Sequence, residues 1–225
     1  MNKGSLKKSA LDFLINPNYI AWRQIEKKIE SKSNLLNNKI LDFGCGHMPY
    51  KNYFNYSEYI GIDLKNYGDG NIADIHYDGR ELPIEDNCFD SIFASASINL
   101  VEDIDLTIAE FKRVLKNNGM VLLWFPVNWF YNPPFSPELL SKKLIQLNFK
   151  KVKVDTCICN FSFVFLVFLK LLNKVINYLP SYILRNFVKV LIFPFFNMLG
   201  ILFERVKFDS DICGFYFISA QNKKN

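Results

Sequence analysis

The sequence predicts an α/β fold in which helices cover both faces of a mostly parallel sheet. Three observations predict it. Short apolar segments alternate with amphipathic segments along residues 38–156, which is the pattern of strand–helix–strand units. A glycine-rich turn, Gly44-Cys45-Gly46, follows the first apolar segment. A carboxylate, Asp63, ends the second apolar segment.

Composition limits the class of protein. The chain has 225 residues, of which 50% are hydrophobic, so it is long and apolar enough to bury a full core. The formal net charge of +5 is small, and we expect no nucleic-acid partner. Five cysteines without a Cys-x-x-Cys pair and only two histidines predict free thiols in a reducing compartment and no metal site.

The basic N-terminus and the overall composition predict the location. No apolar stretch of signal-peptide type follows residues 1–8, so we expect a cytoplasmic protein. The abundance of Asn, Lys and Ile is typical of an AT-rich bacterial source.

Each element follows from local pattern. Isoleucines near helical spacing predict a helix over residues 18–30. Apolar runs predict strands at residues 39–43, 59–63, 72–77, 88–94, 120–125, 152–154 and 213–220. Helical spacing predicts a helix over 105–115, which Gly119 is expected to end. Ser136 and Pro137 are typical of a helix start, and that helix is expected to reach Leu147. Pro49 is expected as the first residue of another helix.

The turn after the first strand is the candidate cofactor site. Glycines there allow a tight turn and leave no side chain between the backbone and a nucleotide-like ligand. The start of the expected helix at Pro49 would offer free N–H groups. Asp63 lies 21 residues after Asp42, where a carboxylate can accept both hydroxyl hydrogens of a ribose. Asp78 can accept the adenine amino group, with Gly79 supplying a backbone N–H.

These motifs resemble the class I S-adenosylmethionine-dependent methyltransferases. The resemblance rests on Ile40-Leu41-Asp42-Phe43-Gly44-Cys45-Gly46, on the strand ending at Asp63, and on Asp78-Gly79-Arg80-Glu81-Leu82-Pro83-Ile84-Glu85-Asp86-Asn87-Cys88-Phe89-Asp90. It covers roughly residues 38–156. Gly44 to Tyr50 is similar to a bacterial branch, methyltransferase type 11, that is found with surface-polysaccharide biosynthesis.

The resemblance implies a doubly wound seven-stranded sheet with an antiparallel last strand and a hydrophobic helical insertion before it. It implies one domain, divided into a lead-in (1–37), a cofactor-binding core (38–156), a Phe-rich insertion (157–208) and a last strand with tail (209–225). The implied cofactor is S-adenosylmethionine, bound by Asp42, Gly44, Cys45, Gly46, Asp63, Leu64, Asp78 and Gly79.

Two departures from the family pattern concern catalysis. Met48 takes the place of the family's third glycine. Asn99 and Leu100 stand where the family often has Glu-His. The polar candidates near a substrate are Asn99, Asn128, Tyr131 and His47. Methyl transfer is an in-line displacement that orientation can accelerate, and it needs a base only where the acceptor loses a proton, so no catalytic residue is assigned.

A Phe-rich segment, residues 161–206, separates the core from the last strand. It holds nine of the 22 Phe residues and five basic residues against one acid, Glu204. Its longest charge-free run has 14 residues, 190–203, and a membrane span needs about 20, so a transmembrane helix is not expected. Three interpretations remain open: contact with a membrane surface, packing on the sheet, and a homodimer contact.

We therefore expect methyl transfer from S-adenosylmethionine to a small-molecule or lipid-linked acceptor, such as a glycan precursor. Contact through residues 161–206 would place the protein at the inner face of the membrane. Two other functions remain open. One is a catalytically silent scaffold that binds the cofactor. The other is a membrane-surface interaction protein with a vestigial nucleotide fold.

Overall fold

The computed structural model describes residues 10–65, 72–126, 136–158, 160–206 and 214–224. The chain forms two compact units, one of residues 30–155 and 215–225, and one of residues 1–29 and 156–214. We call the first the sheet unit and the second the helical unit. The four-part division at residues 37, 156 and 208 stays a prediction.

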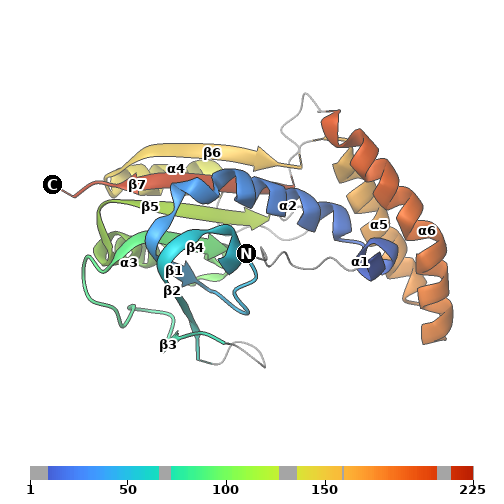
Figure 1. The fold of residues 1–225 in the computed structure, drawn as a ribbon, viewed down its shortest axis with the longest axis horizontal. Helices are drawn as coiled ribbons and strands as arrows, with labels where there is room; N and C mark the ends of the chain where they lie inside the picture. The colour runs from blue at the N-terminus through green and yellow to red at the C-terminus, as the bar shows by residue number, and fades with distance from the viewer. Residues whose placement is uncertain (1–9, 66–71, 127–135, 159, 207–213, 225) are drawn as a thin grey trace. The chain divides into compact units, whose positions relative to one another are not determined.

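The sheet unit is built on seven strands in the order β3-β2-β1-β4-β5-β7-β6 (Figure 1). The strands are β1 (Asn37–Phe43), β2 (Asn55–Leu64), β3 (Ile75–Tyr77), β4 (Phe89–Ser95), β5 (Leu115–Pro126), β6 (Phe149–Cys157) and β7 (Phe215–Asn222). Strands β1 to β5 pair in parallel, whereas β7 runs antiparallel to β5. The expected fold class, a mostly parallel seven-stranded sheet with a reversed last strand, is confirmed.

Two helices pack against this sheet because their apolar residues recur at helical spacing. α3 (Ile104–Val114) buries Ile108 and Phe111, and α4 (Pro137–Gln146) buries Leu140 and Leu144. These side chains share one core with the buried residues of β1, β4 and β5. The predicted start of α4 is confirmed, because the Ser136 side chain accepts the Leu139 N–H and Pro137 follows it.

Two predicted helix boundaries are wrong. No α-helix begins at Pro49; a short 3-10 turn, η2 (Lys51–Tyr53), stands between β1 and β2. Gly119 does not end α3, because that helix stops at Val114 and Gly119 lies inside β5. Its missing side chain serves close packing instead, since a Cβ there would lie 3.0 Å from the Asp90 carbonyl oxygen.

The helical unit contains α1 (Ala10–Ile15), most of α2 (Tyr19–Lys32), α5 (Ser162–Ile176), α6 (Tyr182–Leu202) and the 3-10 turn η4 (Phe203–Arg205). The predicted helix over residues 18–30 and the helical insertion before the last strand are confirmed, whereas α1 was not predicted. Ile20, Leu169, Ile176 and Phe193 form the core of this unit.

Candidate functional site

The glycine-rich turn after β1 is held by backbone hydrogen bonds to β2. The amides of Gly44 and Cys45 both donate to the carbonyl oxygen of Ile62, at 2.8 and 3.2 Å. Gly44 has φ +66°, a conformation that glycine adopts at little cost. A Cβ on Gly44 would lie 2.2 Å from the Cβ of Ser97. Gly44 is therefore required by packing within the protein.

Gly46 differs from Gly44, although it also has a positive φ, +50°. A Cβ on Gly46 would meet no protein atom within 4 Å. Its amide donates to Asp63 Oδ2 at 2.8 Å, and Asp63 Oδ1 accepts the Leu64 amide at 2.8 Å. The turn and the end of β2 therefore fix the Asp63 carboxylate, which is buried, beside an open space over Gly46.

Met48, at the position of the resembled family's third glycine, adopts φ +50°. This conformation costs a side-chain-bearing residue about 1–2 kcal/mol. The side chain of Met48 lies over Gly61, where an added Cβ would come within 2.2 Å of the Met48 methyl carbon. The turn therefore keeps a glycine-like backbone at residue 48, and the apolar side chain covers the middle of β2.

The loop after β3 carries Asp78 and Gly79. The Asp78 carboxylate is exposed and accepts the Arg80 amide at 3.0 Å. Gly79 has φ +94°, which only glycine adopts readily. These residues stand at the strand end next to Asp63, because β3 pairs in parallel with β2.

A network from α3 anchors the continuation of this loop. Arg113 donates to the carbonyl oxygens of Leu82 and Ile84 at 3.0 and 2.6 Å and to Asp86 at 2.8 Å. Glu110 accepts the Leu82 amide at 2.8 Å and pairs with Arg113 at 2.7 Å. The hydrogen bond from Arg113 lowers the pKa of Glu110, so this carboxylate stays ionised and keeps the loop on α3.

The loop after β4 closes the other side. Ser97 Oγ donates to the Phe43 carbonyl oxygen at 2.6 Å, which ties this loop to the end of β1. The Ala96 amide donates to the Trp124 carbonyl oxygen at 2.9 Å, and Ala96 has φ +54°. A positive φ at alanine is strained, and such residues are held in place by their surroundings, often at functional sites.

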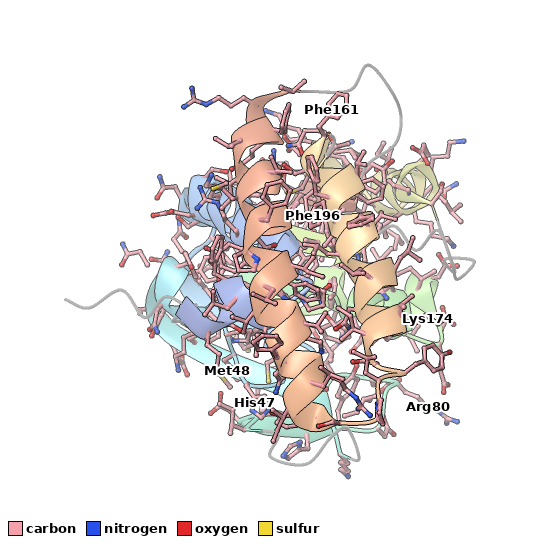
Figure 2. All side chains as sticks on the ribbon, turned by 90° about the vertical axis from the view of Figure 1, so that its right-hand side faces the viewer. His47, Met48, Arg80, Phe161, Lys174 and Phe196 are labelled. Carbon is pink, nitrogen blue, oxygen red and sulfur yellow. The ribbon has the colours of Figure 1, made fainter. Side chains whose placement is uncertain are left out.

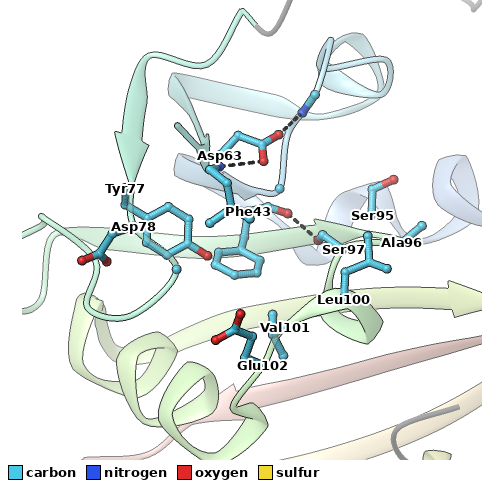
Figure 3. Close-up of a pocket in the computed structure, with 14 residues that line it drawn as sticks. Phe43, Asp63, Tyr77, Asp78, Ser95, Ala96, Ser97, Leu100, Val101 and Glu102 are labelled. Atoms are coloured by element: carbon cyan, nitrogen blue, oxygen red, sulfur yellow. Dashed lines mark hydrogen bonds between the residues drawn. The ribbon is translucent and has the colours of Figure 1, made fainter. Parts of the chain in front are cut away.

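Together these segments enclose a pocket of about 330 Å³ (Figure 3). It is lined by Phe43, Gly44, Gly46, Asp63, Leu64, Tyr77, Asp78, Gly79, Ser95, Ala96, Ser97, Leu100, Val101 and Glu102. The volume lies within the range of about 300–1000 Å³ that is typical of small-molecule and cofactor sites. The pocket opens at the carboxyl ends of β1, β2 and β4, where open α/β sheets bind their ligands.

Six of the eight predicted cofactor residues line this pocket: Gly44, Gly46, Asp63, Leu64, Asp78 and Gly79. Asp42 and Cys45 are buried and are not among the lining residues. Tyr59 donates to Asp42 Oδ2 at 2.7 Å, whereas the other carboxylate oxygen of Asp42 is buried without a partner. Burial raises the pKa of Asp42 to about 7 and that of the Cys45 thiol to about 12.

The remaining candidates are dispersed. His47 is exposed, and Asn99 is half-buried in the 3-10 turn η3 (Ile98–Leu100). Asn128 and Tyr131 lie outside the described residues. Within the described part of the chain, no three His, Cys, Asp or Glu side chains gather as a metal site would require. Cys45, Cys88 and Cys157 are free thiols there.

Sequence reasoning missed one wall of the pocket, which is formed by the last residue of β4 and the segment after it: Ser95, Ala96, Ser97, Val101 and Glu102. A sequence signal existed, because this segment follows a buried strand adjacent to the glycine turn, at the switch point of the sheet. The Glu110–Arg113 network was also missed. This network joins residues about 30 positions apart in the sequence, so no local sequence pattern predicts it.

Comparison with known proteins agrees with this geometry. Residues 41–123 match a family model described as a methyltransferase domain. A demethylmenaquinone methyltransferase from Staphylococcus saprophyticus is 32% identical over 117 residues, which are 45% of this chain and 49% of that protein. The chain thus spans about half the length of this curated relative.

Two solved structures show the fold. A SAM-dependent methyltransferase from Archaeoglobus fulgidus superimposes with a TM-score of 0.56 at 16% identity, over 88% of this chain and 93% of that one. Phosphoethanolamine N-methyltransferase 2 from Haemonchus contortus, solved with S-adenosyl-L-methionine, gives 0.54 at 13% identity, over 100% and 60%. Residues 41–123 are thus similar to a methyltransferase domain, and the chain has the fold of S-adenosylmethionine-dependent methyltransferases.

Proposed function

We propose that the chain transfers the methyl group of S-adenosylmethionine to a small-molecule acceptor and that the pocket of Figure 3 holds this cofactor. The observation that carries the proposal is the pair formed by Gly46 and Asp63. A fixed, buried carboxylate stands beside a glycine whose absent side chain leaves open space. This is the cradle that a nucleoside requires at the end of the first two strands.

Asp63 is the ribose ligand in this proposal. Each of its oxygens already accepts one backbone N–H. A carboxylate has about four acceptor sites, so two remain for the two ribose hydroxyls. The backbone hydrogen bonds hold the carboxylate in place before the cofactor arrives, which lowers the entropy lost on binding.

Asp78 and Gly79 form the adenine end of the site. Asp78 is exposed and lines the pocket, and its Oδ1 accepts the Arg80 amide, so its carboxylate keeps acceptor sites for the adenine amino group. Leu64, Tyr77 and Leu100 supply apolar surface for the ring. Gly44 and Cys45 act through the backbone, and Asp42 supports the turn from within the core.

The bound cofactor supplies an electrophilic methyl group, and the protein holds the acceptor atom in line with it. Proximity and orientation contribute most of the acceleration in such an in-line displacement. The described lining residues include three carboxylates, Asp63, Asp78 and Glu102, and no histidine. We therefore propose an acceptor atom that is nucleophilic without a strong base, or one whose proton passes to water.

The acceptor in this proposal is small or carried on a lipid, such as a glycan precursor made at the cytoplasmic face of a bacterial membrane. Support comes from the Phe-rich insertion, whose apolar residues are widely exposed, and from the resemblance of Gly44 to Tyr50 to the polysaccharide branch. Dimerisation through the same segment is the competing explanation of its exposure.

Calorimetric titration with S-adenosylmethionine tests cofactor binding. Asp63→Ala is expected to weaken binding about 100-fold, because it removes two hydrogen bonds to a charged group. Asp78→Ala is expected to weaken it about tenfold. Asp105→Ala is the matched control, since Asp105 is an exposed carboxylate of α3 outside the pocket. Undetectable binding to the wild-type chain, or unchanged affinity in Asp63→Ala, would contradict the proposal.

Catalysis needs a separate measurement, because a silent cofactor-binding scaffold is the second candidate. The observation that favours it is Leu100, an exposed apolar residue where the resembled family often has histidine. Labelled methyl transfer to small-molecule and lipid extracts of the host distinguishes the two. Label recovered in an acceptor supports the enzyme; tight binding with no transfer to either extract supports the scaffold.

A further inference from the structure

The helix α6 carries an apolar ridge that none of the described residues covers. Its side chains recur every three or four residues, so they share one side of the helix. All of them are exposed: Ile183, Phe187, Leu191, Phe195, Met198 and Leu202. The opposite side of α6 buries Phe193, Asn197 and Gly200. The ridge is therefore surplus to the core of the helical unit.

The helix α5 adds a second ridge beside the first. Its exposed apolar residues are Val164, Phe168, Leu171 and Val175, and the exposed Tyr178 follows just after its end. α5 and α6 lie side by side (Figure 2). The rings of Phe168 and Phe196 meet between them, with centroids 4.6 Å apart. We call the two ridges together the α5–α6 face. Single, scattered apolar side chains are normal on the surface of a soluble protein, whereas a contiguous exposed patch such as this one marks an interaction site.

Positive charge accompanies this face. Between Phe161 and Phe203 the sequence has four cations, Lys170, Lys174, Arg185 and Lys189, and no acid. The next acid, Glu204, is neutralised by Lys27 at 2.7 Å. Lys174, Arg185 and Lys189 lie near the turn between the helices, where Tyr178 and Tyr182 are 81% and 75% exposed. Tyrosines and cations beside an apolar surface match the headgroup region of a bilayer.

A second copy of the chain fits this face less well than lipid does. A symmetric dimer places the same patch on both sides of the contact. This patch has four cations and no acid between Phe161 and Phe203, so the partner's copy would offer no anion to pair with them, and a concentration of like charge at an interface is unfavourable. Anionic lipid headgroups instead neutralise each cation and leave the ridges in contact with acyl chains.

A spanning helix also fits less well than one lying in the surface. By length and composition, residues Tyr182–Arg205 could cross a membrane, with a mean hydropathy of 1.8. However, α6 is tied to its own unit along one side. Asn197 Nδ2 donates to the Phe13 carbonyl oxygen at 2.8 Å, and Ser162 Oγ donates to the carbonyl oxygen of Gly200. Only the outer side of α6 is free for lipid.

We propose that the α5–α6 face lies in the surface of an anionic lipid bilayer, with its ridges among the upper acyl chains and Lys170, Lys174, Arg185 and Lys189 at the lipid phosphates. The helix pair inserts in the plane of the interface and does not span. The proposal is independent of methyl transfer, because it concerns only the helical unit.

Vesicle flotation of the full chain tests the proposal. The protein is expected to float with vesicles that contain phosphatidylglycerol and to float poorly with phosphatidylcholine alone. High salt should reduce the difference, since it screens the headgroup charge. Failure to float with either vesicle would overturn the proposal, whatever the outcome of the cofactor titration.

Two double variants assign the effect to the face. Phe187→Ser with Leu191→Ser is expected to lower partitioning at least about tenfold. The matched control is Leu139→Ser with Ile145→Ser, an exposed apolar pair on α4, which should float like the wild type. Because all four residues are exposed, thermal unfolding should change little in both variants. Equal flotation of the two variants would contradict the proposal.

The charge and the topology are tested separately. Lys174→Gln with Lys189→Gln should lower partitioning into anionic vesicles about tenfold. Lys150→Gln with Lys153→Gln on β6 is its control and should leave partitioning unchanged. Sodium carbonate should extract the wild type from vesicles; resistance would indicate a spanning helix and overturn surface insertion. The face would be assigned to dimerisation instead if the wild type formed a stable dimer and did not bind vesicles, and if Phe187→Ser with Leu191→Ser converted that dimer to a monomer.

Discussion

The sheet unit and the helical unit use apolar residues in opposite ways. In the sheet unit, large side chains such as Phe89, Phe93 and Phe111 are buried, and polar groups gather at the carboxyl ends of the strands. In the helical unit, the core of buried residues is small, and many of the large apolar side chains of α6 are exposed.

Both units also bury polar side chains. The helical unit buries Asn160, Ser162 and Asn197, whose side chains hydrogen-bond to backbone or side-chain groups of the same unit. Buried polar groups of this kind fix one arrangement of the helices. The difference teaches that the apolar composition of the sheet unit is explained by its own core, whereas that of the helical unit points to a surface outside the chain.

The largest expected effect is a difference in stability between replacing a buried and an exposed phenylalanine of α6. Phe193→Ala should destabilise the protein by about 4 kcal/mol, because it leaves a cavity in the core of the helical unit. Phe187→Ala, at a side chain that is 61% exposed, should change stability by less than about 0.5 kcal/mol. Urea unfolding measures both. Similar losses would mean that the ridge belongs to the core after all.

The next effect separates the two glycines of the pocket turn. Gly44→Ala places a Cβ against Ser97 at positive φ, so a loss of about 3 kcal/mol is expected. Gly46→Ala has the same backbone strain without the clash and should lose about 1 kcal/mol. Thermal unfolding checks the order. Ser97→Gly in the Gly44→Ala background should recover part of the loss; no recovery would contradict the contact.

A pH effect tests Asp42, a buried carboxylate of the sheet unit. The pKa of Asp42 is raised to about 7 by burial, from 3.8. The folded state therefore binds a proton that the unfolded state releases, and stability falls as pH rises from about 4 to 7. Asp42→Asn should remove most of this decrease. Unfolding in urea across this pH window measures it, and identical slopes in both proteins would refute it.

The smallest effect compares the helix caps. Leu139 N–H reaches Ser136 Oγ at 3.2 Å in α4, whereas Leu184 N–H reaches Ser181 Oγ only at 3.5 Å in α6. Ser136→Ala should cost about 1 kcal/mol, and Ser181→Ala about half as much, because the longer hydrogen bond is weaker. Thermal unfolding of both variants measures the ranking; a larger loss in Ser181→Ala would reverse it.

Much of the candidate site could be predicted, because its signals are local. A strand followed by Gly44-Cys45-Gly46 indicates a tight turn whatever surrounds it. Asp63, at the end of the neighbouring strand, had to lie beside that turn in a parallel sheet. The structure brings them together through the Gly46 amide.

The two wrong helix boundaries came from residues that are compatible with more than one local structure. Pro49 is favourable at a helix start, yet the segment between β1 and β2 satisfies its backbone through turns, such as the Met48 amide on the Cys45 carbonyl oxygen at 2.8 Å. Gly119 resembled a helix end, but Asn118 took the left-handed conformation at φ +66° instead. The local preferences of Pro49 and Gly119 are compatible with either structure, and the packing of distant segments decides which one forms.

The sequence by itself determined the fold class, the seven strands in their chain order, and the carboxylates at the strand ends. The spacing of hydrophobic residues and the residues that favour turns are local properties, so they can be read from the sequence without knowing which distant segments are in contact. Only the tertiary structure decided that Ser97 contacts Gly44, that Arg113 holds the loop after Asp78, and that the ridges of α5 and α6 are exposed. These facts depend on which distant segments pack together, and an apolar stripe has the same pattern whether it faces a core or a membrane.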